Sequence, residues 1–171
     1  MAESNPVPSR ERTVTLQDPL AGLAAARSLS GLAYLTAMQR GDLPPPPIGV
    51  LLGFSIDEIA PGRAVFSVVP DEYHYNPIGS VHGGLAATLF DSALGCAIHS
   101  ALEAGAGYTT LELHVNYVRG ITRATGRVRC VANVLHLGGR IATAEAKLLD
   151  EAGTLYGHAT TTCMIFRGRD K

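Results

Sequence analysis

The stretch that decides the fold is GGLAATLFDSALGCAIHSAL, residues 83–102. It is apolar nearly all round, which is typical of a helix that is buried on most of its surface. Asp91 is the only residue in it with a formal charge. A sheet wrapped around a helix would bury it in this way, so we expect one long helix from about residue 82 to residue 103.

Strand patterns lie on both sides of this helix. They combine alternating apolar residues with turn-forming residues at their ends. The predicted strands cover residues 49–59, 63–69, 109–118, 127–137, 140–149 and 154–166. The strands do not alternate with helices as they do in a doubly wound parallel sheet. We therefore predict an α+β fold, an antiparallel sheet around one central helix.

The first 47 residues have a different character. Between residues 18 and 38 the leucines recur at a helical spacing, which predicts an additional N-terminal helix that packs on something larger. The segment DLPPPPI at 42–48 is rich in proline and should be an extended, rigid connector. We expect a tail, helix and connector over 1–47 and the main domain over 48–167.

Composition excludes several classes of protein. With 14 basic and 15 acidic residues the net charge is −1, which does not suit a nucleic-acid or membrane-surface protein. The chain has no run of about 18 apolar residues and no apolar core of a signal peptide near its start, so we expect a cytoplasmic protein. Its three cysteines form no CxxC pair and its six histidines have no metal-ligand spacing, so no metal site is expected.

Asp91 is the first candidate for chemistry. A carboxylate on a buried helix is costly unless it is hydrogen-bonded or neutralised. The three-to-four spacing places four residues near one face: Gly84, Ala87, Asp91 and Gly95. Because this face has small side chains, a ligand or a second subunit could approach the carboxylate closely. The alternative is a core aspartate that bonds a neighbouring loop.

The start of the helix is the second candidate. Gly83 and Gly84 give it an N-terminus with uncovered N–H groups, which attracts developing negative charge as an oxyanion hole does. A tight turn is the simpler interpretation of two adjacent glycines. An oxyanion site two turns from a carboxylate is a stronger signal than either feature alone, and Asn76, just upstream, could orient a substrate.

Two segments carry a resemblance to a known family, NPIGSVHGG at 76–84 and ATLFD at 87–91. Together they resemble the PaaI-type acyl-CoA thioesterases of the hotdog superfamily, whose acidic residue follows the His-Gly-Gly histidine by nine positions. Stretches 108–113, 116–119 and 136–140 are also similar, so the resemblance covers roughly 47–166. It implies a hotdog fold, hydrolysis of an acyl-CoA without a cofactor, and a homodimer or homotetramer with its sites between subunits.

The resemblance also implies a role for each site residue. Asp91 would be the nucleophile or general base, and the N–H of Gly83 would hold the thioester oxygen. Asn76 would orient the carbonyl or the water, and His82 would shape the loop and contact the thioester region. Thr110, or its neighbour Thr109, would assist the carboxylate from the facing subunit.

Contacts with the coenzyme A arm are implied in the same way. The residues concerned are Tyr117, Arg119, Arg123, His136, Gly138 and Arg140. Arginine forms forked hydrogen bonds to phosphate, which suits the nucleotide end of coenzyme A. Members of the family often carry a second basic residue where Gly139 stands, and solvated surface arginines are the alternative.

Other functions stay open at this point. A Ser-His-Asp hydrolase is disfavoured because the chain has no GxSxG segment. A hotdog hydratase would need an Asp–His pair a few residues apart, and His82 and Asp91 are nine apart. A protein that binds acyl-CoA without hydrolysing it remains the non-enzymatic alternative, because fold does not fix function.

Overall fold

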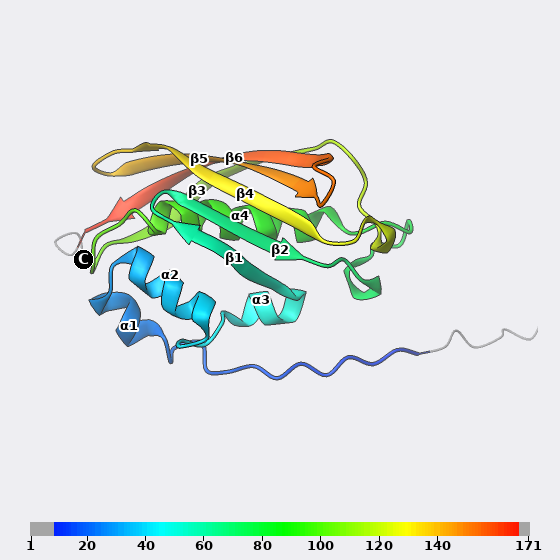
Figure 1. Ribbon diagram of the computed structural model, residues 1–171, viewed down its shortest axis with the longest axis horizontal. Helices are drawn as coiled ribbons and strands as arrows, with labels where there is room; N and C mark the ends of the chain where they lie inside the picture. Colours follow the sequence, from blue (N-terminus) through cyan, green and yellow to red (C-terminus); the bar gives the residue numbers. More distant parts are fainter. Residues whose placement is uncertain (1–8, 168–171) are drawn as a thin grey trace, which may run out of the picture.

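An antiparallel sheet wraps around one long helix, α4 (Gly83–His99), in the computed structural model, which describes residues 9–167 (Figure 1). Within these residues the sheet has six strands in the order β1-β2-β4-β5-β6-β3. Their bounds are β1 Phe54–Ala60, β2 Arg63–Val68, β3 Gly107–Tyr117, β4 Val128–Leu137, β5 Ile141–Asp150 and β6 Leu155–Phe166. The predicted α+β hotdog fold is confirmed. Residues 1–8 of the predicted N-terminal part lie outside the described residues.

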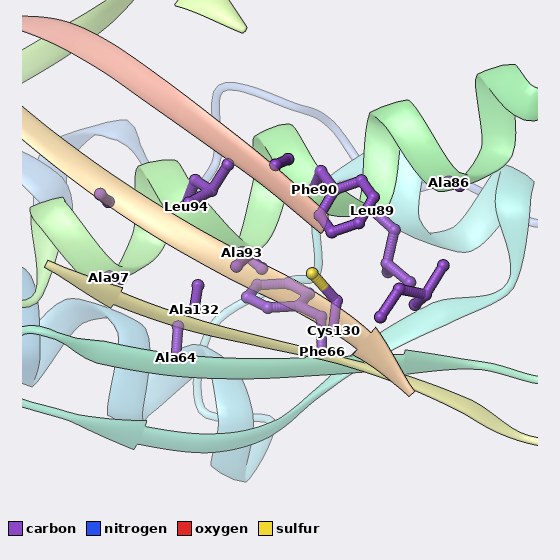
Figure 2. Packing of buried hydrophobic residues seen from close by; sticks show 14 of the residues in the cluster. Ala64, Phe66, Ala86, Leu89, Phe90, Ala93, Leu94, Ala97, Cys130 and Ala132 are labelled. Carbon is purple, nitrogen blue, oxygen red and sulfur yellow. The ribbon is translucent and has the colours of Figure 1, made fainter. Parts of the chain in front are cut away.

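The core lies between α4 and the concave face of the sheet (Figure 2). Phe90, Leu94 and Ile98 on the helix are fully buried. Several of the residues that the strands turn toward them are small: Ala64, Cys130, Ala132, Ala142 and Ala144. These small residues let the helix approach the sheet, and each large apolar side chain buried there stabilises the fold by about 2 kcal/mol.

The helix α4 ends at His99, four residues earlier than expected. Ser100 follows it, and its hydroxyl lies 2.7 Å from the carbonyl oxygen of Ala97 and 2.8 Å from that of Ala60. The same hydroxyl accepts the N–H of Gly62 at 2.9 Å. Because these bonds tie the end of the helix to the β1–β2 turn, the chain leaves the helical path at this point.

Three helices precede the sheet: α1 (Leu23–Ser28), α2 (Gly31–Arg40) and α3 (Pro47–Leu52). The helix α2 packs against β1 and against the C-terminal end of α4. The N–H of Gly31 donates to the carbonyl oxygen of Leu102 at 3.0 Å. A Cβ at Gly31 would lie 1.8 Å from the carbonyl oxygen of His99, so this contact requires glycine.

The predicted strand over 49–59 is partly wrong. Residues 44–46 are not helical, as expected for the connector, but α3 then begins at Pro47 and β1 begins only at Phe54. Proline is well suited to the first position of a helix because its fixed φ fits and its missing N–H is not needed there. Gly53, at φ +69°, ends the helix in the left-handed conformation.

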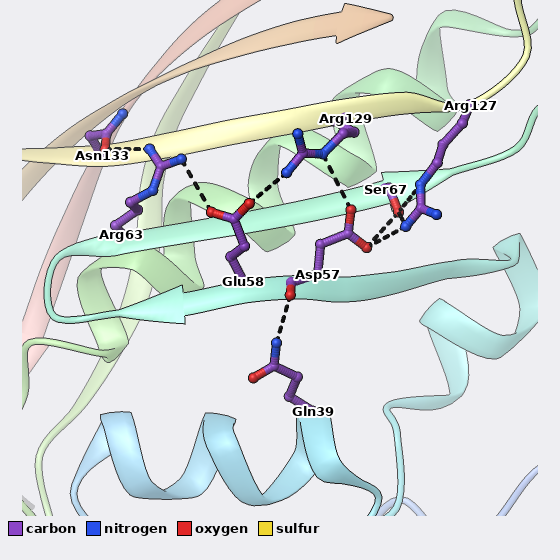
Figure 3. A network of polar contacts seen from close by, with 8 residues as sticks. All are labelled: Gln39, Asp57, Glu58, Arg63, Ser67, Arg127, Arg129 and Asn133. Atoms are coloured by element: carbon purple, nitrogen blue, oxygen red, sulfur yellow. Dashed lines mark hydrogen bonds and ion pairs between the residues drawn. The ribbon is translucent and has the colours of Figure 1, made fainter. Parts of the chain in front are cut away.

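On the face of the sheet away from α4, ion pairs join β1, β2 and β4 (Figure 3). Asp57 pairs with Arg127 at 2.6 Å, and Glu58 pairs with Arg129 at 2.6 Å. Ser67, which is buried, accepts from Arg127 and donates to Asp57 at 2.8 Å. Since carboxylates already neutralise these arginines, the cluster holds strands together and offers little to an anion.

Candidate functional site

Asp91 lies on the side of α4 that the sheet leaves open. Its neighbour Phe90 points into the core, but Asp91 itself is exposed in the single chain. The expectation of a buried aspartate is therefore wrong for one chain, because α4 is covered by the sheet on one side only. The alternative of a core aspartate bonded to a loop is wrong for the same reason.

Thr110 fixes the orientation of this carboxylate. Its hydroxyl donates a hydrogen bond of 2.9 Å to Oδ1 of Asp91. The bond forms inside one chain, whereas the resemblance implied a threonine from the facing subunit. Thr109 is exposed, and Thr110 makes the contact because its side chain faces α4 from the edge strand β3.

The start of α4 has one uncommitted amide. The N–H of Gly84 donates to Nδ1 of His82 at 2.8 Å, so His82 caps the helix with its ring. The N–H of Gly83 has no acceptor among residues 9–167. Nδ1 of His82 is therefore the acceptor that caps the helix, and the N–H of Gly83 is left as an available donor.

Tyr117 covers Gly83 from β3. Its hydroxyl donates to the carbonyl oxygen of Gly83 at 3.1 Å, and a Cβ on Gly83 would lie 3.2 Å from the tyrosine ring. A pocket of about 250 Å³ opens beside this contact. Its lining includes Val81, Ala86, Phe90, Ile121, Leu148 and Tyr156. His82, Gly83, Tyr117 and Arg119 also border it, so an apolar hollow lies next to a free amide and a cation.

Asn76 acts within its own loop. Its Oδ1 accepts the N–H groups of Ile78 and Ser80, at 3.1 and 3.4 Å, and its Nδ2 donates to the Ser80 hydroxyl at 3.2 Å. The loop also contains Gly79 at φ +82°. The predicted contact of Asn76 with a substrate carbonyl stays a prediction, while its bonds show that it shapes the approach to His82.

His74 is a positioning residue that the sequence prediction missed. It is buried, its Nδ1 accepts the N–H of Asp71 at 3.0 Å, and its Nε2 lies 2.8 Å from the carbonyl oxygen of Leu52. Its own carbonyl oxygen accepts the N–H of His82 at 2.8 Å. Burial lowers the pKa of His74, although the bond to Leu52 opposes this. The neutral ring therefore anchors the segment that leads to the helix cap.

The residues predicted for the coenzyme A arm fall into separate places. Tyr117 and Arg119 border the pocket at the start of α4. Arg123 is already paired with Asp71 at 3.5 Å and with Glu72 at 3.7 Å. It is therefore less able to meet a phosphate than its sequence position suggested.

His136, Gly138 and Arg140 belong to the other end of the sheet, at the β4–β5 turn. The register places Ile141 opposite Met164, and Met164 opposite Thr109. Thr109 is eight residues from Tyr117 along β3, which is about 26 Å. A single chain therefore does not bring the two groups of predicted coenzyme A contacts together.

Comparison with known proteins places this architecture in a family. The thioesterase superfamily profile matches residues 78–156. The chain is 30% identical over 134 residues to 1,4-dihydroxy-2-naphthoyl-CoA hydrolase of Escherichia coli, covering 78% of this chain and 93% of that one. It is 30% identical over 103 residues to human acyl-coenzyme A thioesterase 13, covering 60% and 72%. The chain belongs to the thioesterase superfamily.

A solved structure supports the same assignment. A variant of the phenylacetic acid degradation protein PaaI from Thermus thermophilus superimposes with a TM-score of 0.63 at 29% identity, covering 69% of this chain and 97% of that one. The predicted resemblance to PaaI-type proteins and the predicted class of enzyme, a thioester hydrolase, are confirmed. Among residues 9–167, no helix combines the length and the apolar character needed to cross a membrane.

Proposed function

We propose that this chain hydrolyses an acyl-coenzyme A to a free acid and coenzyme A, with Asp91 as its catalytic carboxylate. The observation that carries the proposal is an accessible carboxylate, held by Thr110, on the same helix whose first N–H is free. Relatives named as CoA-thioester hydrolases support this substrate class. The chemistry draws on these residues alone, and coenzyme A enters only as part of the substrate.

Each group has one task in this reaction. The Asp91 carboxylate either attacks the thioester carbon directly or removes a proton from the water that attacks it. Both routes place negative charge on the thioester oxygen, which the N–H of Gly83 stabilises. The C–S bond then breaks, and the coenzyme A thiolate leaves and takes up a proton. If the attack is direct, water hydrolyses the resulting mixed anhydride.

We infer that the complete site needs two chains. Gly83 and Asp91 are eight residues apart, which is about 12 Å along a helix axis. A single carbonyl group cannot contact both within one chain, because each contact spans about 3 Å. Two α4 helices packed antiparallel along their open sides would place Gly83 of one chain opposite Asp91 of the other. The small residues on that side, Gly84, Ala87 and Thr88, allow such a close approach.

The coenzyme A arm is assigned to the pocket at the start of α4. Arg119 borders it and forms no ion pair with any residue in the described range, so its guanidinium is available to a phosphate. Tyr117 would contact the pantetheine part. His136, Gly138 and Arg140 could reach the same ligand only from another subunit, which fits a tetramer made of two dimers.

We place this enzyme in the cytoplasm.

The first experiment measures release of free thiol from phenylacetyl, benzoyl and aliphatic acyl-CoA esters by purified protein. Asp91→Asn should lower kcat by about 10³-fold while substrate binding is retained. Asp42→Asn makes the same chemical change at an exposed aspartate of the connector and should leave kcat unchanged. Unchanged turnover in Asp91→Asn would reject the mechanism.

A second experiment tests the shared site by complementation. Asp91→Asn removes the carboxylate, and Gly83→Pro removes the N–H while proline remains compatible with the first helical position. In a mixed dimer, one site carries both defects and the other carries neither. Mixing the two inactive variants after subunit exchange should restore about a quarter of wild-type activity. No restoration, with mixed dimers present by native mass spectrometry, would contradict the two-chain site.

A further inference from the structure

Tyr108 occupies the space directly beyond the carboxylate on α4. It lies on β3, two residues before Thr110, and its ring covers Gly95, which follows Asp91 by four residues or one helical turn. A Cβ at Gly95 would lie 2.5 Å from the Tyr108 hydroxyl oxygen and 2.7 Å from its ring. The helix therefore has no side chain at residue 95, and the tyrosine ring fills that space instead.

Aromatic residues continue in the same direction. The rings of Tyr108 and His99 have centroids 5.6 Å apart, and His99 and Tyr34 of α2 follow at 5.7 Å. A hollow of about 390 Å³ lies here, and Tyr108 is part of its wall. Its other lining residues include Leu23, Ala26, His99 and Phe166, together with two arginines, Arg27 and Arg167. Tyr108 thus stands between the carboxylate and a second, largely apolar space beneath α1.

Tyr108 itself and the nearest thiol, Cys96, are neutral. Burial raises the pKa of Cys96 to about 12, so its thiol keeps its proton. Burial, with Cys96 and Asp91 nearby, raises the pKa of Tyr108 well above its usual value, so the phenol does not ionise. The tyrosine ring itself is an uncharged aromatic surface, which suits a hydrocarbon group better than the phosphates of coenzyme A.

We propose that Tyr108 sets the acyl-length limit of this enzyme by closing the acyl side of the site one turn beyond Asp91. The inference rests on the proposed thioesterase function and names its substrate class, esters of short or compact acyl groups. A longer chain would need the hollow beneath α1, and the Tyr108 ring blocks the way to it.

The experiment compares kcat/KM over straight-chain acyl-CoA esters from acetyl to dodecanoyl for the wild type, Tyr108→Ala, Tyr108→Leu and Tyr108→Phe. The wild type should show a steep fall above a short chain length. Each newly buried methylene contributes about a fourfold gain, so Tyr108→Ala should raise the ratio of kcat/KM for decanoyl over butyryl at least about tenfold. Tyr108→Leu should have a smaller effect, and Tyr108→Phe, which keeps the ring, should retain the wild-type profile.

Tyr34→Ala is the matched control. It removes a tyrosine ring that contacts His99 but does not cover Gly95, and it should leave the chain-length ratio unchanged. A wild type that hydrolyses dodecanoyl and butyryl esters equally well would overturn the proposal without any variant. An unchanged ratio in folded Tyr108→Ala or Tyr108→Leu would overturn it and leave the thioesterase function intact. A wild type that hydrolyses neither these esters nor the phenylacetyl and benzoyl esters would overturn both.

Discussion

The hydroxyl of Tyr117 donates a hydrogen bond of 3.1 Å to the carbonyl oxygen of Gly83, while the N–H of the same glycine has no acceptor within residues 9–167. The peptide group after Gly83 is thus held by Tyr117 on β3, and the peptide group before Gly83 keeps its N–H free. Because an oxyanion site depends on fixed donors, the contact gives the free amide a defined direction.

Two substitutions at Gly83 distinguish the effect of losing its N–H from the effect of adding a side chain next to Tyr117. Gly83→Pro removes the N–H and should lower kcat by about 10²-fold or more, as the loss of an oxyanion donor does. Gly83→Ala keeps the N–H but places a methyl group 3.2 Å from the Tyr117 ring, and should cost about tenfold or less. Steady-state kinetics of both variants, with circular dichroism to verify folding, give the comparison. Equal losses in the two would show that the amide has no special role.

Thr110 and Thr109 offer a test of the carboxylate's orientation. Thr110→Ala removes the hydrogen bond to Asp91 and should lower kcat about tenfold or more, because the carboxylate loses its fixed position. Thr110→Ser keeps the hydroxyl and should retain most of the activity. Thr109→Ala, at the exposed neighbouring position, is the control and should behave as the wild type. The idea is wrong if Thr110→Ala and Thr109→Ala turn over equally fast.

The stability of the chain should depend on pH through His74. Burial holds its pKa below the ordinary value of about 6.5, so the folded state binds fewer protons than the unfolded state at mildly acidic pH. The free energy of unfolding should therefore decrease as pH falls below about 6.5. Protonation would also remove the acceptor that Nδ1 offers to the N–H of Asp71.

Thermal unfolding of the wild type, His74→Gln and His158→Gln between pH 5 and 8 checks this. His74→Gln should be less stable at pH 8 but should lose less stability on acidification. Part of the dependence of stability on pH should remain in this variant, because burial also lowers the pKa of His99. His158→Gln, at an exposed position on β6, should show the same dependence of stability on pH as the wild type. If His74→Gln also shows the wild-type dependence, His74 is excluded as the cause of the loss of stability at low pH.

The ion-pair cluster should affect stability and leave catalysis unchanged. Arg127→Met removes the donor to the Asp57 carboxylate and to the buried hydroxyl of Ser67, and should lower the free energy of unfolding by about 1 kcal/mol. Urea denaturation at low and high salt measures it, and the difference from the wild type should shrink in salt. Arg40→Met, at the end of α2, is the control. A loss of kcat in folded Arg127→Met would contradict the separation of this cluster from the active site.

The sequence was sufficient for the architecture but not for the environment of its charged residues. The apolar stretch 83–102 and the alternating strands predict the fold because burial imposes those patterns. The same apolar stretch made Asp91 look buried, since a pattern cannot show that a sheet covers only one side of a helix. The helix α3 escaped prediction because it is short and starts within a run of prolines.

Long-range partners explain the other misses. Arg123 looked free because Asp71 and Glu72 lie about fifty residues earlier in the chain. His74 gave no local signal beyond its three-residue spacing from Asp71, and its bond to Leu52 depends on the fold. The wide separation of Arg119 and Arg140 became visible only with the register of three strands.

The close packing of Gly31 against the end of α4 has a practical consequence. A cut at the predicted boundary between residues 47 and 48 would remove the N–H of Gly31, which donates to the carbonyl oxygen of Leu102. It would also remove α2 with its buried Leu35, and so expose to water the surface of β1 that α2 covers. A shortened chain that contains only residues 48–167 should therefore aggregate and be insoluble when it is expressed in cells. Anyone who wants a minimal version of this enzyme should keep the leading helices as an integral part of it.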